Sequence, residues 1–232
     1  MVTANDREIE VKIAIRDLAG AAAALRRAGF EKVGRCVHER NQLYDFPDGR
    51  LRKAGCALRL RTVGKETVLT FKGKKKIVAG MKVREELETG IADPRTMMLI
   101  LRRAGLEPAF FYEKLRTTFA KSRLTAVIDH TPIGDFLELE GEPAAIDAEI
   151  PALGYSRRDF IKESYVELFR KAHTGDMVFG EGGVDPREGP PARSKKAQRR
   201  RLTAPAGRPP NPALRTRTQV PPPPRSGRPK NG

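Results

Sequence analysis

The sequence of 232 residues has no tryptophan, only two cysteines and no long apolar run. Cys36 and Cys56 form no CxxC pair and belong to no Cys/His cluster, which argues against a disulfide scaffold or a structural zinc site. No stretch approaches the roughly 18 consecutive apolar residues of a membrane-spanning helix. The common phosphate loops, GxxxxGKS/T and strand-linked GxGxxG, are also absent. Because the first ten residues are polar and acidic, unlike a signal peptide, we expect a cytoplasmic protein.

Positive charge is in excess and unevenly spread. The chain has 45 Lys and Arg against 29 Asp and Glu, a net charge of +16. Residues 173–232 hold 13 of these basic residues, 4 acidic residues and 12 of the 18 prolines. Such a segment buries too little apolar surface to offset the entropy lost on ordering. We therefore predict one domain over residues 1–172 and a disordered, basic, Pro-rich tail over 173–232, which either contacts polyanions or only aids solubility.

Hydrophobic patterning predicts a mainly antiparallel sheet with three helices. Strict alternation over residues 8–15 is typical of a strand. Helices are expected at 18–28, after the cap Asp17, at 94–104, after Asp93, and at 159–171. The other expected strands lie at 30–46, 57–62, 67–72, 81–88, 111–119, 124–130 and 135–141. The expected fold class is α+β, with about eight strands closing into a barrel.

Like or paired charges recur on one face of strand after strand. The pairs, two residues apart, are Glu8 and Glu10, Arg59 and Arg61, Arg84 and Glu86, Lys114 and Arg116, and Glu138 and Glu140. Like charges on one strand face repel each other unless something neutralises them. A polyanion suits the cations and a divalent metal ion suits the carboxylates. This indicates a phosphate-and-metal site in a charged barrel lumen, with the apolar residues facing outward under the helices.

Ordered motifs extend this pattern over residues 7 to about 170. They are Glu8-Ile9-Glu10-Val11-Lys12, Asp48-Gly49-Arg50-Leu51-Arg52, Ala57-Leu58-Arg59-Leu60-Arg61, Leu69-Thr70-Phe71-Lys72-Gly73, Arg84-Glu85-Glu86-Leu87-Glu88, Lys114-Leu115-Arg116, Ile128-Asp129, Phe136-Leu137-Glu138-Leu139-Glu140-Gly141 and Lys162-Glu163-Ser164-Tyr165. The chain thereby resembles the CYTH domains, or triphosphate tunnel metalloenzymes, and is most similar to their class IV adenylate cyclase branch.

The resemblance implies an eight-stranded antiparallel tunnel, a Mg²⁺ or Mn²⁺ ion, and an enzyme that acts on a triphosphate. By position, the implied metal ligands are Glu8, Glu10, Asp129, Glu138 and Glu140. The implied triphosphate contacts are Lys12, Arg59, Arg61, Lys72, Arg84, Lys114 and Arg116. Glu8, Glu10 and Lys12 are the implied catalytic residues, and Glu86 is expected to orient Arg84. Surrounded by carboxylates, Lys12 should stay charged. A homodimer is also in keeping with this branch.

Several questions stay open at the level of sequence. The reaction is either cyclisation of ATP to cyclic AMP and pyrophosphate or hydrolysis of tripolyphosphate, thiamine triphosphate or a nucleoside triphosphate. A non-catalytic polyphosphate- or nucleotide-binding module is the alternative of another class. Tyr44, Phe46 and Phe111 are candidates for stacking on a base. The run Lys74-Lys75-Lys76 is expected to form a solvated hairpin tip, with a lid over the tunnel mouth as the alternative.

Overall fold

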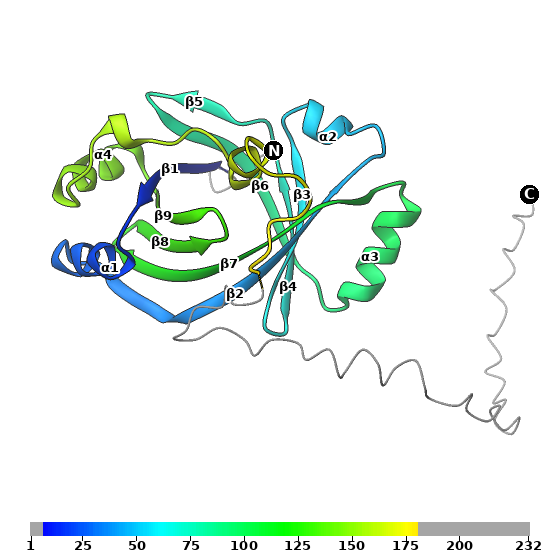
Figure 1. Cartoon of the computed structure of the whole chain (residues 1–232), viewed down its shortest axis with the longest axis horizontal. Coiled ribbons are helices and arrows are strands. Elements are labelled where there is room, and N and C mark those ends of the chain that lie inside the picture. Colours follow the sequence, from blue (N-terminus) through cyan, green and yellow to red (C-terminus); the bar gives the residue numbers. More distant parts are fainter. Residues whose placement is uncertain (1–6, 181–232) are drawn as a thin grey trace, which may run out of the picture. The chain divides into compact units, whose positions relative to one another are not determined.

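The computed structural model describes residues 7–180 (Figure 1). The strands of this part are β1 (Arg7–Ile15), β2 (Glu31–Asp45), β3 (Ala57–Val63), β4 (Glu66–Lys72), β5 (Lys76–Val78), β6 (Met81–Gly90), β7 (Glu107–Lys121), β8 (Leu124–Thr131) and β9 (Gly134–Glu140). The α-helices are α1 (Leu18–Arg27), α2 (Arg50–Lys53), α3 (Pro94–Arg103), α4 (Pro143–Ala152) and α5 (Tyr165–Arg170). A short 3-10 helix covers Arg157–Asp159.

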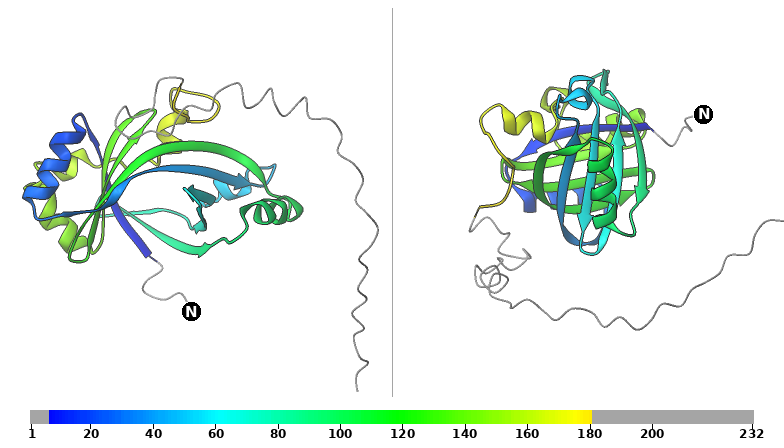
Figure 2. Two further views of the ribbon diagram at one scale, coloured as in Figure 1. Left: turned by 90° about the horizontal axis from the view of Figure 1, so that it is seen from below. Right: turned by 90° about the vertical axis from the view of Figure 1, so that its right-hand side faces the viewer.

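Eight of the strands close into an antiparallel barrel. Their order around the barrel is β1-β9-β8-β7-β2-β3-β4-β6, and β6 pairs with β1 to complete the circle. The remaining strand, β5, pairs with the Met81–Val83 part of β6. The two views of Figure 2 show this curved sheet, with α1 and α4 at one end and α3 at the other. The eight-stranded antiparallel barrel expected from the sequence is confirmed.

The apolar side of β1 faces outward, as the alternation predicted. Val11 and Ile13 are buried in a core that includes Leu25 of α1 and Ile146 and Ile150 of α4. A second apolar core lies beneath α3, and a third lies around α5. Because the apolar residues of β1 pack under helices, its charged residues are left to line the lumen.

Side-chain caps begin the two helices whose starts were predicted most clearly. Asp17 accepts a hydrogen bond from the backbone of Ala19 at the start of α1. Asp93 accepts bonds from the backbones of Arg95 and Thr96 at the start of α3. These contacts satisfy N–H groups that have no partner within the helix, so each helix begins at the predicted residue.

The C-terminal part of the domain differs from the prediction. Helix α4 was not expected, although Pro143 at its start and the spacing of Ile146 and Ile150 are helical signals. The single helix expected at 159–171 is wrong. It is replaced by the 3-10 helix, an extended link and the six-residue α5. In the link, Phe160 forms a bridge with Ile13, so pairing with β1 overrides helix formation.

Residues just beyond 172 pack on the barrel. Met177 is fully buried and exchanges backbone hydrogen bonds with β7, through Phe111 and Glu113. Phe179 stacks on His130, with 5.3 Å between ring centroids. The first residues of the predicted tail thus contact the barrel, and its remainder, residues 181–232, lies outside the described residues. Within residues 7–180, the structure contains no helix long and apolar enough to span a membrane.

Candidate active site

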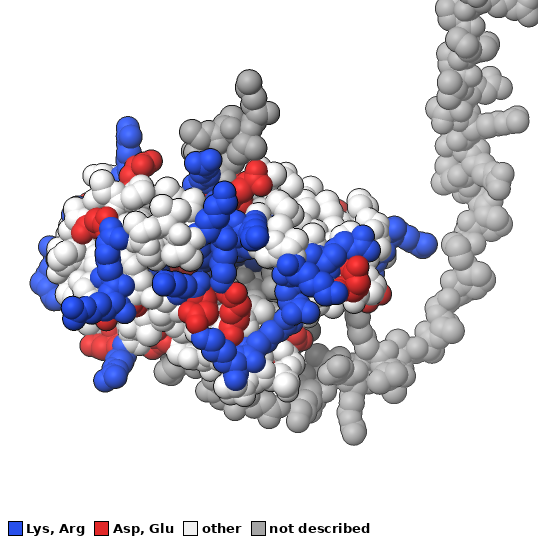
Figure 3. Space-filling view, turned by 90° about the horizontal axis from the view of Figure 1, so that it is seen from above, with Lys and Arg blue, Asp and Glu red and all other residues white. Residues whose placement is uncertain are grey.

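The barrel encloses a cavity of about 870 Å³ lined mainly by charged side chains. Eleven of the twelve predicted site residues line it: Glu8, Glu10, Lys12, Arg59, Arg61, Lys72, Arg84, Lys114, Arg116, Glu138 and Glu140. The twelfth, Asp129, is fully buried behind the cavity wall. Figure 3 shows many Lys and Arg side chains, with acidic side chains among them, on one face of the molecule. The strand alternation thus brings charges from distant parts of the sequence into one lumen.

Three carboxylates crowd together where β1 meets β9. Glu10 lies opposite Glu140 in the ladder, and Glu8 is two residues from Glu10 on the same face. Burial, together with the negative charges of Glu8 and Glu10, raises the pKa of Glu140 to about 7. Burial also raises the pKa values of Glu8 and Glu10, as does the charge of nearby carboxylates. These carboxylates are poorly compensated as anions, and a divalent cation would relieve that repulsion.

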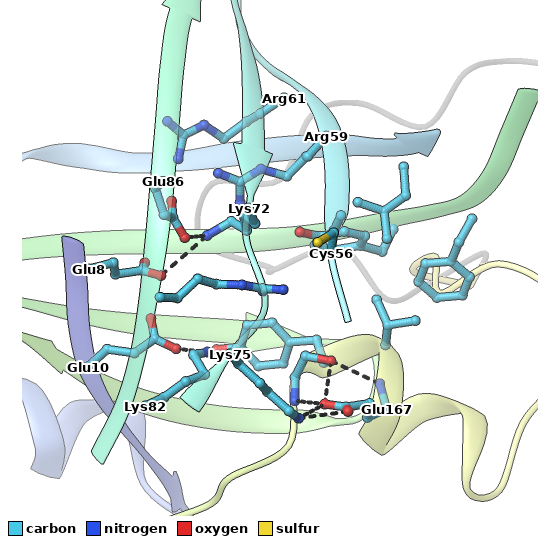
Figure 4. A pocket seen from close by; sticks show the side chains of 18 of the residues that line it. Glu8, Glu10, Cys56, Arg59, Arg61, Lys72, Lys75, Lys82, Glu86 and Glu167 are labelled. Atoms are coloured by element: carbon cyan, nitrogen blue, oxygen red, sulfur yellow. Dashed lines mark hydrogen bonds and ion pairs between the residues drawn. The ribbon is translucent and has the colours of Figure 1, made fainter. Parts of the chain in front are cut away.

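Lysines from neighbouring strands occupy the space between these carboxylates. Lys72 lies 3.5 Å from Glu8 and pairs closely with Glu86, while Lys82 pairs with Glu10 (Figure 4). Across residues 7–180, no three Cys, His, Asp or Glu side chains already converge as a ready metal-binding group. The oxygen donors suit Mg²⁺ or Mn²⁺, and the lysines occupy the places that such a cation would take.

A second cluster joins the cations of β7 to buried acids. Asp129 accepts from Lys114 at 2.9 Å and from the Arg116 guanidinium at 2.6 and 2.7 Å. Glu39 lies 3.4 Å from Lys114, and the nearby cations lower its pKa to about 2 despite its burial. Tyr165 donates a further hydrogen bond to Asp129 at 2.9 Å. These contacts favour a role for Asp129 in holding the two cations, over the metal-binding role expected for it.

Lys12 lies where β1 approaches α5. Its ammonium is 3.4 Å from Glu138, donates to the carbonyl of Glu163 at 3.2 Å and lies 3.7 Å from the centre of the Tyr165 ring. Burial lowers the pKa of Lys12, and this effect outweighs the opposing influence of Glu138. That Lys12 stays charged remains a prediction, because its burial disfavours the charged form whereas Glu138 favours it.

The cations of β3 meet an acid of β6. Arg59 lies 3.4 Å from Glu88 and donates to Thr70 at 3.2 Å, and Arg61 lies 3.7 Å from Glu88. Thr70 in turn donates to Glu88 at 2.6 Å. The two guanidinium groups are therefore held side by side, which suits a ligand that carries several neighbouring negative charges.

Arg84 is anchored by backbone carbonyls. It donates to Gly73 at 2.6 Å and to Gly55 at 2.9 Å. The expectation that Glu86 orients Arg84 is wrong, because Glu86 pairs with Lys72 instead. Arg84 thus ties β6 to the segments beside β3 and β4.

Sequence reasoning missed several residues that line the cavity or lie behind its wall. Lys82 was identifiable, because it precedes Arg84 by two residues and therefore shares its face of β6. Glu39 gave no comparable signal, since it is not paired with another charge along β2. Tyr165 was quoted as part of a motif, but a helix outside the barrel was not expected to send a side chain against Lys12.

The basic run at 74–76 does not form a hairpin tip, and that prediction is wrong. Lys76 begins β5, and Lys75 reaches α5, where its ammonium lies 2.5 and 2.7 Å from the two carboxylate oxygens of Glu167 (Figure 4). The side chains of Lys75 and Glu167 both line the cavity. The ion pair therefore joins the β4–β5 connection to α5 at the cavity, in keeping with the alternative that the run covers the tunnel mouth.

Comparison with known proteins found a matching family and several solved structures with a similar fold. The sequence model of the CYTH domain family matches residues 6–165. Among solved structures, the PH1819 protein of Pyrococcus horikoshii is 26% identical, with a TM-score of 0.62 over 72% of this chain and 99% of that one. A Vibrio parahaemolyticus protein assigned as an adenylate cyclase is 20% identical, with a TM-score of 0.61 over 70% and 97% of the two chains.

A third solved structure comes from a plant. A Hippeastrum protein assigned as an adenylyl cyclase, whose dominant activity is that of a triphosphatase, is 18% identical, with a TM-score of 0.55 over 72% of this chain and 97% of that one. Among curated protein sequences, none matches this chain. The two structures below 25% identity bear on the fold alone.

Proposed function

Because the chain belongs to the CYTH domain family, whose members act on triphosphates, we propose that it is a divalent-metal-dependent enzyme that converts ATP to cyclic AMP and pyrophosphate. The observation that supports this proposal is the arrangement of charge in one cavity. Crowded carboxylates on β1 and β9 face cations from β3, β4, β6 and β7. A triphosphate needs many cations along its length, and its chemistry needs a metal ion beside them.

The basic side chains hold the triphosphate. Arg59, Arg61 and Arg116 suit two-point contacts with phosphate oxygens, whereas Lys72, Lys82 and Lys114 act as point charges. In the structure all of these cations except Lys114 are paired with carboxylates that line the same cavity. Lys114 pairs with Asp129 and Glu39, which lie behind the cavity wall. A substrate with about four negative charges would exchange those carboxylates for phosphate oxygens without leaving any cation unpaired.

Glu8, Glu10 and Glu140 would hold the metal ion. Their raised pKa values indicate that nearby lysines compensate their negative charges only in part. A bound Mg²⁺ or Mn²⁺ would supply Lewis-acid polarisation of the phosphoryl oxygens. Glu138 pairs with Lys12 and Arg116, so we assign it to positioning these cations rather than to the metal.

In the proposed reaction, the ribose 3′-hydroxyl releases its proton to water as its oxygen forms a bond to the α-phosphorus. The bond from that phosphorus to the bridging oxygen breaks, and pyrophosphate leaves. The cations around the β- and γ-phosphates stabilise the charge that develops on the leaving group. The buried ammonium of Lys12 lies 3.4 Å from Glu138, and we assign it to the phosphate that reacts.

Hydrolysis to orthophosphate is the second reaction that the same cavity could carry out. It requires water to attack the terminal phosphorus, with the triphosphate shifted along the same cations. A non-catalytic binding module is less well supported, because a site that only binds polyanions gains nothing from the repulsion among Glu8, Glu10 and Glu140.

Product analysis tests the proposal. Purified protein is incubated with ATP, thiamine triphosphate or tripolyphosphate, with Mg²⁺ and with Mn²⁺, and the products are separated by ion-exchange chromatography. Cyclic AMP and pyrophosphate from ATP are the expected products. Orthophosphate release without cyclic AMP would mean that the protein hydrolyses triphosphates and does not cyclise ATP. Tight triphosphate binding with no product would contradict an enzymatic function altogether.

A further inference from the structure

Helix α3 exposes apolar side chains on the side that faces away from the barrel. Its inner side, with Met97, Met98 and Leu101, packs in the core cluster beneath the helix. On its outer side, Leu99 is 60% exposed and Ile100 is 53% exposed. Among the helices of residues 7–180, α3 is the only one with large hydrophobic side chains exposed in this way. The free energy gained by removing this surface from water is therefore available to a partner.

Three arginines surround Leu99 on this outer side. Arg95 lies four residues before Leu99, and Arg102 and Arg103 lie three and four residues after it. Residues at these spacings are neighbours on the surface of a helix. All three arginines are exposed, so their guanidinium groups can reach a partner that Leu99 contacts.

The positive charge of these arginines is not neutralised by neighbouring carboxylates. Within residues 7–180, none of the three forms an ion pair with an Asp or Glu side chain. The helix itself contains no acidic residue. Asp93, which precedes it, directs its carboxylate to backbone N–H groups of the first turn. The outer side of α3 thus presents positive charge around an apolar centre, which complements a partner that is anionic and partly apolar.

The position of α3 suits a broad, flat partner. The helix lies at one end of the barrel, and α1 and α4 lie at the other (Figures 1 and 2). None of its residues lines the charged cavity. Helices that lie in a membrane interface combine exposed Leu or Ile side chains with Lys and Arg, which remain at the level of the headgroups. An anionic lipid surface therefore fits the shape, the charge and the exposed apolar residues of this helix together.

We propose that the outer side of α3 binds anionic phospholipid surfaces. Leu99 and Ile100 enter the boundary between headgroups and acyl chains, and the three arginines contact the lipid phosphates. The protein then lies on the membrane surface with its barrel outside the lipid. This inference does not depend on the proposed function, because α3 contributes nothing to the cavity.

The absence of tryptophan from the chain allows a direct test. In the full-length protein, Ile100→Trp places one indole on the outer side of α3. We expect its fluorescence to shift to shorter wavelength with vesicles of equimolar phosphatidylcholine and phosphatidylglycerol, and to stay unchanged with phosphatidylcholine alone. Val33→Trp is the matched control, because Val33 is also 53% exposed and lies on β2 just after α1. Attraction of the basic residues beyond 180 to the vesicles would not by itself remove either indole from water.

Vesicle sedimentation measures the contribution of the arginines. The triple variant Arg95→Gln, Arg102→Gln and Arg103→Gln should weaken binding to the anionic vesicles by about fivefold for each arginine removed. The control is Arg26→Gln with Arg27→Gln, in the last turn of α1, which should bind like the unchanged protein. Turnover of soluble triphosphate should be the same in the triple variant and the unchanged protein, so this test and that of the proposed function fail separately.

Four results would overturn the inference. They are an unshifted emission of Ile100→Trp with anionic vesicles, an equal shift in Val33→Trp, equal binding by the triple variant and the unchanged protein, and a dimer in light scattering that Leu99→Asp dissociates. The last result would mean that a second copy of the chain covers this side of α3. If circular dichroism shows that the triple variant does not fold, Arg103→Gln alone should still weaken binding about fivefold.

Discussion

The ammonium of Lys12 lies 3.7 Å from the centre of the Tyr165 ring, and the hydroxyl of Tyr165 donates to Asp129 at 2.9 Å. One side chain of α5 thus contacts the buried lysine of β1 and the acid that holds the cations of β7. The Tyr165 ring also lies near Lys114, whose ammonium is 5.3 Å from the ring centre. Helix α5 therefore positions basic residues of the lumen, in addition to covering the barrel.

Two substitutions of Tyr165 should distinguish the contribution of its ring from that of its hydroxyl group. Tyr165→Phe keeps the ring beside Lys12, so turnover should fall only a few-fold, with a stability loss of ~1 kcal/mol for the missing hydrogen bond. Tyr165→Leu removes the ring, and turnover should fall roughly tenfold or more, since a cation–π contact in a desolvated site is worth about 2 kcal/mol. Steady-state kinetics and urea unfolding of both variants provide the measurement. Equal loss of turnover in the two would contradict a role for the ring.

Glu39 should make stability depend on pH in acid. Its folded pKa of about 2 lies below its ordinary value of 4.5, because Lys114 and Arg116 stabilise its charge. The stabilisation is present above pH ~4.5 and is lost as the pH falls towards ~2, and it amounts to about 3 kcal/mol at neutral pH.

Glu39→Gln tests this directly. The variant should be less stable than the unchanged protein at pH 7, and the difference should shrink as the pH falls from 4.5 towards 2. Urea unfolding at a series of pH values measures it. A difference in unfolding free energy that stays constant from pH 7 to pH 3 would show that the charge of Glu39 is not what stabilises the fold.

The ion pair between Lys75 and Glu167 should matter less for stability than the cap at the start of α5. Both side chains are partly exposed, so Lys75→Met should cost less than ~1 kcal/mol. Glu167→Ala should cost more, because it also removes the reciprocal bonds between Glu167 and Ser164. Thermal unfolding compares the two. A larger loss in Lys75→Met would mean that the ion pair, and not the cap, secures α5.

Chain shortening should show where the folded domain ends. Removal of residues 181–232 should leave unfolding free energy and turnover unchanged. Removal of 173–232 should destabilise the domain, because it exposes the surface that Met177 covers and breaks its backbone bonds to Phe111 and Glu113. Burial of one such side chain contributes about 1.5–3 kcal/mol. Equal stability of the two shortened chains would return the boundary to residue 172.

The sequence predicts the lumen well because a strand alternates with a period of two. Once the apolar residues of β1 are placed under helices, Glu8, Glu10 and Lys12 can only face inward. The same rule separates two neighbouring aromatic residues. Phe111 was a candidate for stacking on a base, but Phe110 lines the cavity instead, because adjacent residues of a strand point to opposite faces.

Contacts made by loops and short helices could not be predicted in this way. Phe46 contacts Arg50 rather than the cavity, whereas Tyr44 both lines the cavity and packs towards α3. The position of α5 depends on the bridge between Phe160 and Ile13, which has no local signature. The metal role of Asp129 was implied by its position in the family motif, and its contacts with Lys114 and Arg116 of another strand could not be seen from the sequence. Long-range pairing decides these roles.

The most direct test of the account is the double variant Glu10→Gln with Glu140→Gln, with Glu149→Gln outside the lumen as the control. Mn²⁺ affinity, measured by electron paramagnetic resonance, and triphosphate turnover are compared with the unchanged protein. We predict that both fall by roughly a hundredfold or more. Stability at neutral pH should be kept or raised, because two crowded charges with raised pKa values are removed. Full turnover and unchanged Mn²⁺ binding in the double variant would contradict the central claim that these carboxylates hold the metal.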